Sequence, residues 1–331
     1  MSAGPGAAPN RVCALAHIDI PIIQAPMTYI AGAQLAAAVS NAGALGIIET
    51  TSEQGRADLR RVRELTRGAV GANIALLFNR DPAMLDLLVA NDIRFVTTSA
   101  GSPSVFTERL HDAGITVFHV VGTLAAARKA VDAGVDGLVV EGVEGGGFKN
   151  RFGASTMVLL PLVAAHVDIP IVAAGGICDA RSMAAAFVLG AEAVQMGTRL
   201  LASADSPVHG NLKQAVVDAD ETGTVMLPLD GTRMMRVIRT PAAERLDTST
   251  SADQGAAALQ RVQRLYFDGD LDASVANTGQ VAGRIEDLPP AADIITKMWR
   301  GCREVLATTS ERVRPADPAG SDQPAAPSAA S

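Results

Sequence analysis

Cysteine, aromatic residues and long apolar runs are all scarce in this sequence. The cysteines, Cys13, Cys178 and Cys302, lie far apart in a chain of 331 residues, which supports neither a disulfide framework nor a CxxC metal site. No run reaches the roughly 18 uninterrupted apolar residues of a membrane helix. Residues 1–10 lack the charged start and the apolar core of a signal peptide. We therefore expect a cytoplasmic protein with no membrane partner and no metal.

Positive charge is also sparse relative to negative charge. The formal net charge is −7, and the sequence has neither a sustained basic run nor a basic stripe with interleaved aromatic residues. An acidic balance of this kind favours solubility and argues against nucleic acid or an anionic surface as a partner. A small-molecule substrate is the remaining expectation.

Small aliphatic residues supply most of the hydrophobic content of the chain. Hydrophobic residues make up 48% of the chain although aromatic residues make up only 3%, so Ala, Val, Ile, Leu and Gly dominate. That composition is typical of helices packed closely over a parallel sheet, whose strands are buried on both faces. The length suits one large α/β barrel or two ordinary domains.

A recurring unit organises the chain. A helical stretch ends in Asn/Asp-Ala-Gly, and a short apolar run follows, at residues 41–43, 112–114 and 132–134. Leu189-Gly190-Ala191 is a looser copy. The glycine is typical of a left-handed helix stop, and the run that follows it is typical of a buried strand.

Eight such apolar runs alternate with helical patterns such as residues 33–41, 82–89, 124–131 and 180–189. This alternation favours a (β/α)8 TIM barrel over an open sheet. The predicted strands are residues 22–27, 45–49, 70–75, 93–97, 115–120, 137–141, 171–174 and 193–196.

The rhythm changes after the eighth strand. Residues 222–240 predict a short hairpin, 242–270 a mostly helical polar excursion and 291–307 a closing helix. We therefore expect a smaller capping insertion, residues 205–277, on a barrel made of residues 13–204 and 278–310. Residues 1–12 and 311–331 are rich in Ala, Pro, Gly or Ser and are predicted to be disordered.

Glycines mark the ends of the last two barrel strands. Gly175-Gly176 follows the seventh, and Gln195-Met196-Gly197-Thr198 ends the eighth. Glycines let backbone N–H groups approach an anion, and a barrel commonly binds phosphate in these two loops. Simple tight turns are the alternative.

Three other strand ends carry candidate site residues. Glu141 opens a loop that includes Gly146 and Gly147, and four glycines in six positions indicate a backbone folded close to a flat or bulky group, with a flexible loop as the alternative. Asn73, at the end of the third strand, could donate to a ring carbonyl or form a turn. Ala25-Pro26-Met27, at the end of the first strand, could line a planar ring.

Taken together, these motifs resemble those of the nitronate monooxygenase (2-nitropropane dioxygenase) family, which is related to flavin-dependent enoyl-acyl-carrier-protein reductases. The similar stretches are residues 21–27, 36–43, 141–147, 173–177, 195–199, 206–209 and 279–283. The resemblance runs from about residue 18 to residue 300 and implies FMN held non-covalently at the barrel mouth. The implied FMN contacts are Ala25, Pro26, Met27, Asn73, Glu141, Gly146, Gly147, Gly175, Gly176, Gln195, Met196, Gly197 and Thr198.

The sequence departs from the family pattern at two positions. Many relatives have Gln where Glu141 stands, and a carboxylate there could alter the redox behaviour of the flavin. Relatives usually have His directly after the glycine loop, where it can serve as the catalytic base, but this chain has Phe148. Phenylalanine cannot accept a proton.

Three other residues are candidates for the chemistry that this position usually performs. His119, near the end of the fifth strand, replaces the base if its side chain points inward, but strand alternation equally allows it to face the helices. Lys149 and Tyr29 could donate to a substrate. With Phe148, these are the candidate catalytic residues.

Three functions follow from this reading. The first is an FMN-dependent oxidoreductase that oxidises a nitronate-like or other acidic carbon substrate with O2. The second is an NAD(P)H-dependent enoyl-thioester reductase, whose acyl thioester would suit an apolar Phe148. The third is a barrel that binds FMN or a phosphate without redox turnover. A monomer and a homodimer are both compatible with the sequence.

Overall fold

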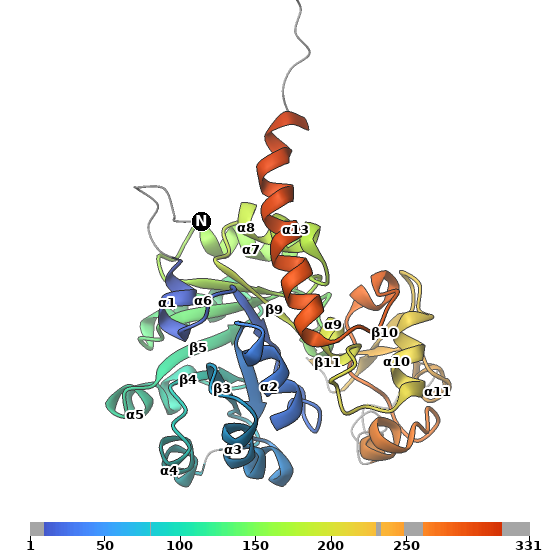
Figure 1. Ribbon diagram of the computed structural model, residues 1–331, viewed down its shortest axis with the longest axis horizontal. Helices are drawn as coiled ribbons and strands as arrows, with labels where there is room; N and C mark the ends of the chain where they lie inside the picture. Colours follow the sequence, from blue (N-terminus) through green and yellow to red (C-terminus); the bar gives the residue numbers. More distant parts are fainter. Residues whose placement is uncertain (1–9, 80, 230–232, 248–260, 313–331) are drawn as a thin grey trace, which may run out of the picture.

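The computed structural model describes residues 10–79, 81–229, 233–247 and 261–312 (Figure 1). The disorder predicted for residues 1–9 and 313–331 therefore lies outside the described residues. The first helix, α1 (Arg11–Ala16), begins inside the segment that was assigned to the N-terminal tail. The last helix, α13 (Ala291–Arg312), extends past the predicted barrel boundary at residue 310.

Eight parallel strands form the predicted barrel. Their order in the sheet is β1-β9-β8-β6-β5-β4-β3-β2. A parallel bridge between Ile23 of β1 and Leu45, just before β2, joins the two edges of this sheet and closes the barrel. The strands are β1 (Ile22–Gln24), β2 (Gly46–Glu49), β3 (Val70–Ala75), β4 (Phe95–Ser99), β5 (Thr116–Val121), β6 (Gly137–Glu141), β8 (Ile171–Ala174) and β9 (Ala193–Met196).

Helices cover the outside of the barrel (Figure 1). α13 packs against α8 and α2 and is the closing helix that the sequence predicted. The other barrel helices are α2 (Ala33–Asn41), α3 (Glu53–Leu65), α4 (Ala83–Ala90), α5 (Thr107–Asp112), α6 (Leu124–Asp132), α7 (Thr156–Ala164), α8 (Ala180–Val188) and α9 (Thr198–Leu201), with a 3-10 turn, η1 (Pro103–Val105), before α5.

The recurring Asn/Asp-Ala-Gly unit ends helices as expected. Gly43, Gly114, Gly134 and Gly190 have φ angles of 86°, 70°, 78° and 105°, in the left-handed region that other residues rarely adopt. The helix therefore stops and the chain turns into the next strand. The first strand ends earlier than predicted, at Gln24, because Pro26 has no backbone N–H to continue the ladder.

A separate hydrophobic cluster fills the barrel interior. It contains Ile23, Phe95, Phe118 and Val139 together with Val12 from α1, which plugs the end of the barrel where the strands begin. Strand alternation then assigns every second residue to this interior and the others to the layer beneath the helices. The plug is held in place by an ion pair of 2.6 Å between Arg11 and Glu192.

The insertion after the eighth strand is joined to the barrel through a small sheet. The predicted hairpin is β10 (Thr224–Pro228) and β11 (Arg233–Ile238), and β11 also pairs with β7 (Gly147–Asn150), the strand that leaves the glycine loop. In the described part of the insertion, three helical segments and a late 3-10 turn accompany it: α10 (Gly210–Val217), α11 (Pro241–Asp247), η3 (Arg264–Asp268) and η4 (Gln280–Arg284). Residues 248–260 of the predicted polar excursion lie outside the described residues.

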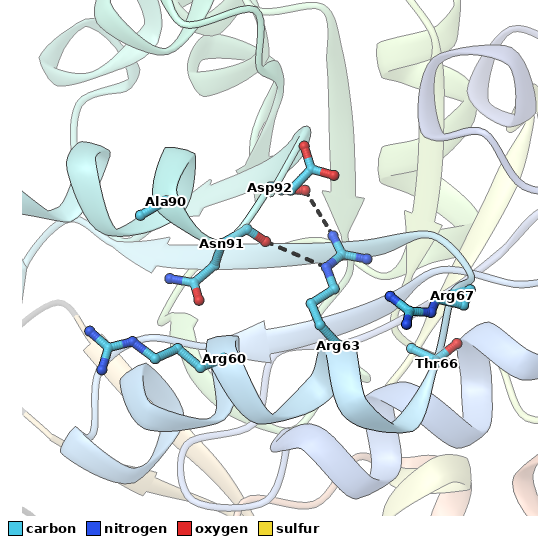
Figure 2. Close-up of a pocket in the computed structure, with 7 residues that line it drawn as sticks. All are labelled: Arg60, Arg63, Thr66, Arg67, Ala90, Asn91 and Asp92. Atoms are coloured by element: carbon cyan, nitrogen blue, oxygen red, sulfur yellow. Dashed lines mark hydrogen bonds between the residues drawn. The ribbon is translucent and has the colours of Figure 1, made fainter.

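A basic cavity lies at the end of the barrel where the strands begin, lined in part by Arg60, Arg63 and Arg67 of α3 and the turn after it (Figure 2). Arg63 donates to the backbone oxygens of Asn91, at 3.4 Å, and Asp92, at 2.8 Å. Cations at the C-terminal ends of α3 and α4 offset the exposed carbonyl groups of those helices. We therefore interpret this cavity as a helix-capping arrangement.

None of the helices in the described part of the chain combines the length and the apolarity needed to span a bilayer.

Candidate active site at the barrel mouth

The strand ends bring the predicted site residues to one face. Ile47, Val139 and Ala193 point into the barrel interior, so the residues two positions further along each strand face the same way at the mouth. Those residues are Glu49, Glu141 and Gln195.

Three backbone N–H groups at the strand and helix ends of this mouth have no acceptor. They belong to Gly146 in the glycine loop, Gly176 after β8 and Thr198 at the start of α9, and among the described residues none of them has a hydrogen-bond partner. Unpaired backbone donors at strand and helix ends form a concave site for an anion, because the partial positive charges add. We call these three groups the amide cradle.

Close packing explains why glycine stands beside the cradle. A Cβ atom on Gly146 would lie 2.8 Å from the backbone of Thr278, and one on Gly279 would lie 2.8 Å from Glu144 O. Gly147, Gly175 and Gly176 have φ angles of 79°, 84° and 80°. Thr198 Oγ1 accepts a hydrogen bond of 2.9 Å from Gly279 N and ties the far end of the chain to the cradle.

The end of β1 lies against the end of β9. Ala25 N donates to Met196 O at 2.8 Å, and a Cβ on Gly197 would be 3.5 Å from Ala25 Cβ and 3.7 Å from Met27 Sδ. Gln195 is buried, and its Oε1 has no hydrogen-bond partner in the described structure. A buried polar atom without a partner costs free energy unless a ligand satisfies it.

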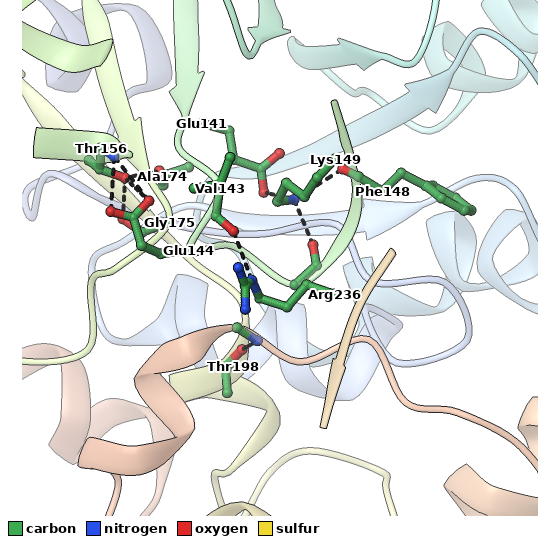
Figure 3. Close-up of polar contacts among 12 residues, drawn as sticks. Glu141, Val143, Glu144, Phe148, Lys149, Thr156, Ala174, Gly175, Thr198 and Arg236 are labelled. Carbon is green, nitrogen blue, oxygen red and sulfur yellow. Dashed lines mark hydrogen bonds and ion pairs between the residues drawn. The ribbon is translucent and has the colours of Figure 1, made fainter. Parts of the chain in front are cut away.

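The glycine loop is held by polar contacts at its start and its end (Figure 3). The Lys149 ammonium, only 5% exposed, forms an ion pair of 2.9 Å with Glu141 Oε1. It also donates to Gly146 O at 2.8 Å and to Phe148 O at 3.1 Å. These contacts use all three protons of the ammonium group, so Lys149 orders the loop and has no proton left to donate to a substrate.

Two further side chains hold the middle of the loop (Figure 3). The Glu144 carboxylate accepts from Thr156 N, at 3.0 and 2.9 Å, and caps the start of α7. Arg236 of β11 donates to Val143 O at 2.8 Å. Burial lowers the pKa of Arg236, and the charge of Glu144 partly opposes that effect. The loop is therefore anchored to α7 and to the insertion, unlike the flexible loop of the alternative reading.

Phe148 and Phe78 meet over one side of the mouth. Phe148 is 39% and Phe78 56% exposed, and their ring centroids lie 6.3 Å apart. Phe78 follows β3, and Phe148 follows the loop after β6. The pair therefore spans the ends of β4 and β5, which lie between these two strands in the sheet. The mouth thus has an apolar rim at the position where the family pattern has histidine.

His119 faces the helices rather than the mouth. Its neighbours Phe118 and Val120 belong to the interior cluster, and its Nδ1 lies 2.7 Å from Thr98 Oγ1. Burial lowers the pKa of His119 to about 4, a backbone hydrogen bond with Gly101 opposes this shift, and Lys129 adds to it. The inward orientation that a base role required is not the one observed.

Two other predicted site residues, Asn73 and Tyr29, already make contacts within the protein. Asn73 Nδ2 donates to Thr97 O and Thr97 Oγ1, both at 3.0 Å, so its amide donor is already committed to β4. Tyr29 has a left-handed φ of 67°, and its ring packs against the core beneath the helices. Asn73 therefore has no unused amide donor for a ligand.

Several residues that shape the site were not among the candidates. Glu144 lies within one glycine-rich motif and Thr278 next to another, so the glycines are the sequence feature that points to both. Arg236 and Phe78 carry no local signal, because each reaches the mouth through tertiary contacts alone.

A closed parallel barrel with unpaired backbone donors at its mouth defines the class, an α/β barrel whose strand ends form the candidate active site. Comparison with known proteins extends this. The sequence profile described as nitronate monooxygenase matches residues 10–84 and 79–301. The chain belongs to the nitronate monooxygenase family, as its motifs predicted, and is an oxidoreductase.

Individual relatives cover most of the chain. A Mycobacterium tuberculosis protein named (3aS,4S,5R,7aS)-5-hydroxy-7a-methyl-1-oxo-octahydro-1H-indene-4-carboxyl-CoA dehydrogenase is 30% identical over 90% of this chain and 97% of its own. The nitronate monooxygenase of Pseudomonas aeruginosa is 34% identical over 62% of this chain and 73% of its own. The structure of FabK from Thermotoga maritima is 34% identical, covers 93% of this chain and 100% of that one, and has a TM-score of 0.83.

Proposed function

We propose that the protein is an FMN-dependent oxidoreductase that acts on a carbon acid, with an acyl thioester as the favoured substrate. The observation that carries the proposal is the amide cradle. The unpaired backbone donors of Gly146, Gly176 and Thr198 suit the phosphate of a flavin mononucleotide. Gln195 Oε1, buried without a partner, would accept from the ring.

The rest of the mouth fits the same group. Ala25, Pro26 and Met27 would line one side of the ring, and Glu141 would lie beside it on the inward face of β6. FMN would supply the capacity to take up and release a hydride, which no side chain provides. The protein's part is to bind, orient and exclude water.

The rim favours a thioester. Phe148 and Phe78 present apolar surface where an acyl chain would enter. One relative that shares most of the chain is named as a dehydrogenase of a carboxyl-CoA compound, which is itself a thioester. NAD(P)H would be the second substrate in the direction of reduction.

Nitronate oxidation with O2 is the second candidate. It is supported by the family and by the Pseudomonas aeruginosa relative of that name. A preformed nitronate is already an anion, so the absence of histidine at Phe148 does not prevent its oxidation.

Absorption spectroscopy tests the proposal. Purified protein should show a flavin spectrum, and NADPH should bleach it under anaerobic conditions, after which crotonyl-CoA should restore the colour. Bleaching by propionate 3-nitronate alone, with no response to NADPH, would favour the second candidate. A bound flavin that no reagent bleaches would instead indicate a barrel without redox turnover, and colourless protein that binds no added FMN would overturn the proposal.

A further inference from the structure

Among the described residues, three carboxylates lie at the mouth, and two of them already accept hydrogen bonds from the protein. Glu49 Oε2 accepts from Thr51 N at 2.8 Å and Ser52 N at 3.0 Å, and its Oε1 accepts from Tyr29 N at 3.2 Å and from the Ser52 hydroxyl. Glu144 is occupied by Thr156. Both are therefore committed to ordering loops and helix ends.

Glu141 differs from these two. Its Oε1 is held by Lys149, while Oε2 has no hydrogen-bond partner among the described residues. Its side chain is 27% exposed, on the inward face at the end of β6. One oxygen of this carboxylate is thus held by Lys149, and no contact is drawn to the other (Figure 3).

Neither Phe148 nor His119 can accept a proton from a substrate at the mouth. Phe148 has no basic atom, and His119 lies on the helix-facing side of β5, with Nδ1 engaged by Thr98. Within the described residues, Glu141 is the acidic side chain at the mouth with an available acceptor oxygen.

We propose that Glu141 is a catalytic residue, the proton acceptor for the C–H group next to the substrate carbonyl, and that Lys149 is its positioning residue. This inference rests on the proposed function. Lys149 joins Glu141 to Gly146 O, so the same ammonium sets the orientation of the carboxylate and the shape of the amide cradle.

The step is a proton transfer. The bond between the α carbon and its hydrogen breaks, the proton goes to Glu141 Oε2, and the electron pair moves onto the thioester carbonyl oxygen as an enolate. In the direction of reduction the same proton returns from the neutral carboxyl group to the α carbon. No oxidant is consumed in this step, since hydride transfer is a separate event.

Hydrogen exchange isolates this step from redox turnover. The FMN-loaded protein is incubated anaerobically with butyryl-CoA in D2O, and loss of the α hydrogens is followed by proton NMR. Glu141→Gln should slow exchange by at least about 100-fold, the lower range for general base catalysis. It should bind FMN with a Kd within about threefold of the original, because the amide keeps the shape and one acceptor.

A matched control lies at the opposite end of the barrel. Glu192 also forms an ion pair, with Arg11, but far from the mouth, and Glu192→Gln should exchange at the original rate. Lys149→Met should lower the exchange rate at saturating thioester by about tenfold, because the carboxylate loses its fixed partner. A purely structural role for Lys149 would instead reduce the amount of folded, FMN-binding protein and leave the rate per bound FMN unchanged.

The outcomes separate the two proposals. If the Glu141→Gln variant exchanges the α hydrogens of butyryl-CoA at the rate of the original protein, the assignment of Glu141 is overturned and the proposed function stands. An original protein that binds FMN but neither exchanges butyryl-CoA nor responds to crotonyl-CoA after NADPH overturns both the thioester substrate and the role of Glu141.

Discussion

The ring of Phe118 lies directly over Gly137, so that a Cβ atom added at residue 137 would be 2.3 Å from the ring. Because the interior is closely packed around Phe118, Gly137→Ala should lower the free energy of unfolding by about 1 to 3 kcal/mol. Urea denaturation measures this change.

A second substitution checks the cause. If the clash with the ring is responsible, the double variant Gly137→Ala/Phe118→Leu should lose about 1 kcal/mol less free energy of unfolding than the two single variants lose in sum. Strict additivity would show that the glycine matters for another reason.

Cofactor binding should depend on Gly146 through the position of the glycine loop. A Cβ at this residue would be 2.8 Å from the Thr278 backbone, and the loop would have to move. We expect Gly146→Ala to raise the Kd for FMN by at least about tenfold. Quenching of FMN fluorescence reports the affinity.

Gly114 provides the control for that change. It has a left-handed φ of 70° but open space around its Cβ position. Gly114→Ala should lower the free energy of unfolding by about 1 to 2 kcal/mol without altering FMN affinity. Equal losses of affinity in both variants would mean that stability, rather than the cradle, controls binding.

The aromatic rim should govern the acyl group. Phe148→Ala removes the contact with Phe78, and we expect KM for a long-chain acyl-CoA to rise about tenfold, since an apolar side chain of this size contributes about 1.5 to 3 kcal/mol when buried by a ligand. Steady-state kinetics with short and long chains measures the effect. Phe152→Ala, at a neighbouring residue that is 84% exposed, should change KM little.

Stability should fall in acid because of His119. Its pKa is lowered from 6.5 to about 4 by burial, so the unfolded chain binds more protons between these values and stability decreases as the pH falls through them. At pH 5 the loss relative to pH 7.5 is about 2 kcal/mol.

Denaturation of His119→Gln at both pH values measures that contribution. The variant should lose about 2 kcal/mol less than the original protein between pH 7.5 and pH 5. A fall that matches the original would show that other groups cause it. Flavin reduction at pH 7.5 should be retained, because the side chain faces the helices.

Much of the fold could be predicted because its signals are local. The Asn/Asp-Ala-Gly stops at Gly43, Gly114 and Gly134 and the buried runs after them are short-range features, and the eight strands follow from them. The glycines of the cradle were visible for the same reason. The orientation of side chains on the strands was harder to predict, because alternation does not say which of the two sets of residues faces the barrel interior. The role of His119 depended on that orientation.

Contacts between distant segments could not be predicted. The ion pair of Lys149 with Glu141 depends on how the loop folds back, and the approach of Phe78 to Phe148 depends on the barrel being closed. Nothing in the sequence around Arg236 indicates that it reaches Val143.

The pairing of β7 with β11 has a consequence for how this enzyme can diverge. Phe148 lies opposite Met235 and Lys149 opposite Met234. The residues proposed to govern substrate entry and to position the proton acceptor therefore share a ladder with a hairpin that is distant in the chain. A change in the length or register of that hairpin would shift both at once. Under the proposed roles, substrate range and reactivity cannot evolve independently. Exchanging this hairpin between homologues should therefore change both properties together.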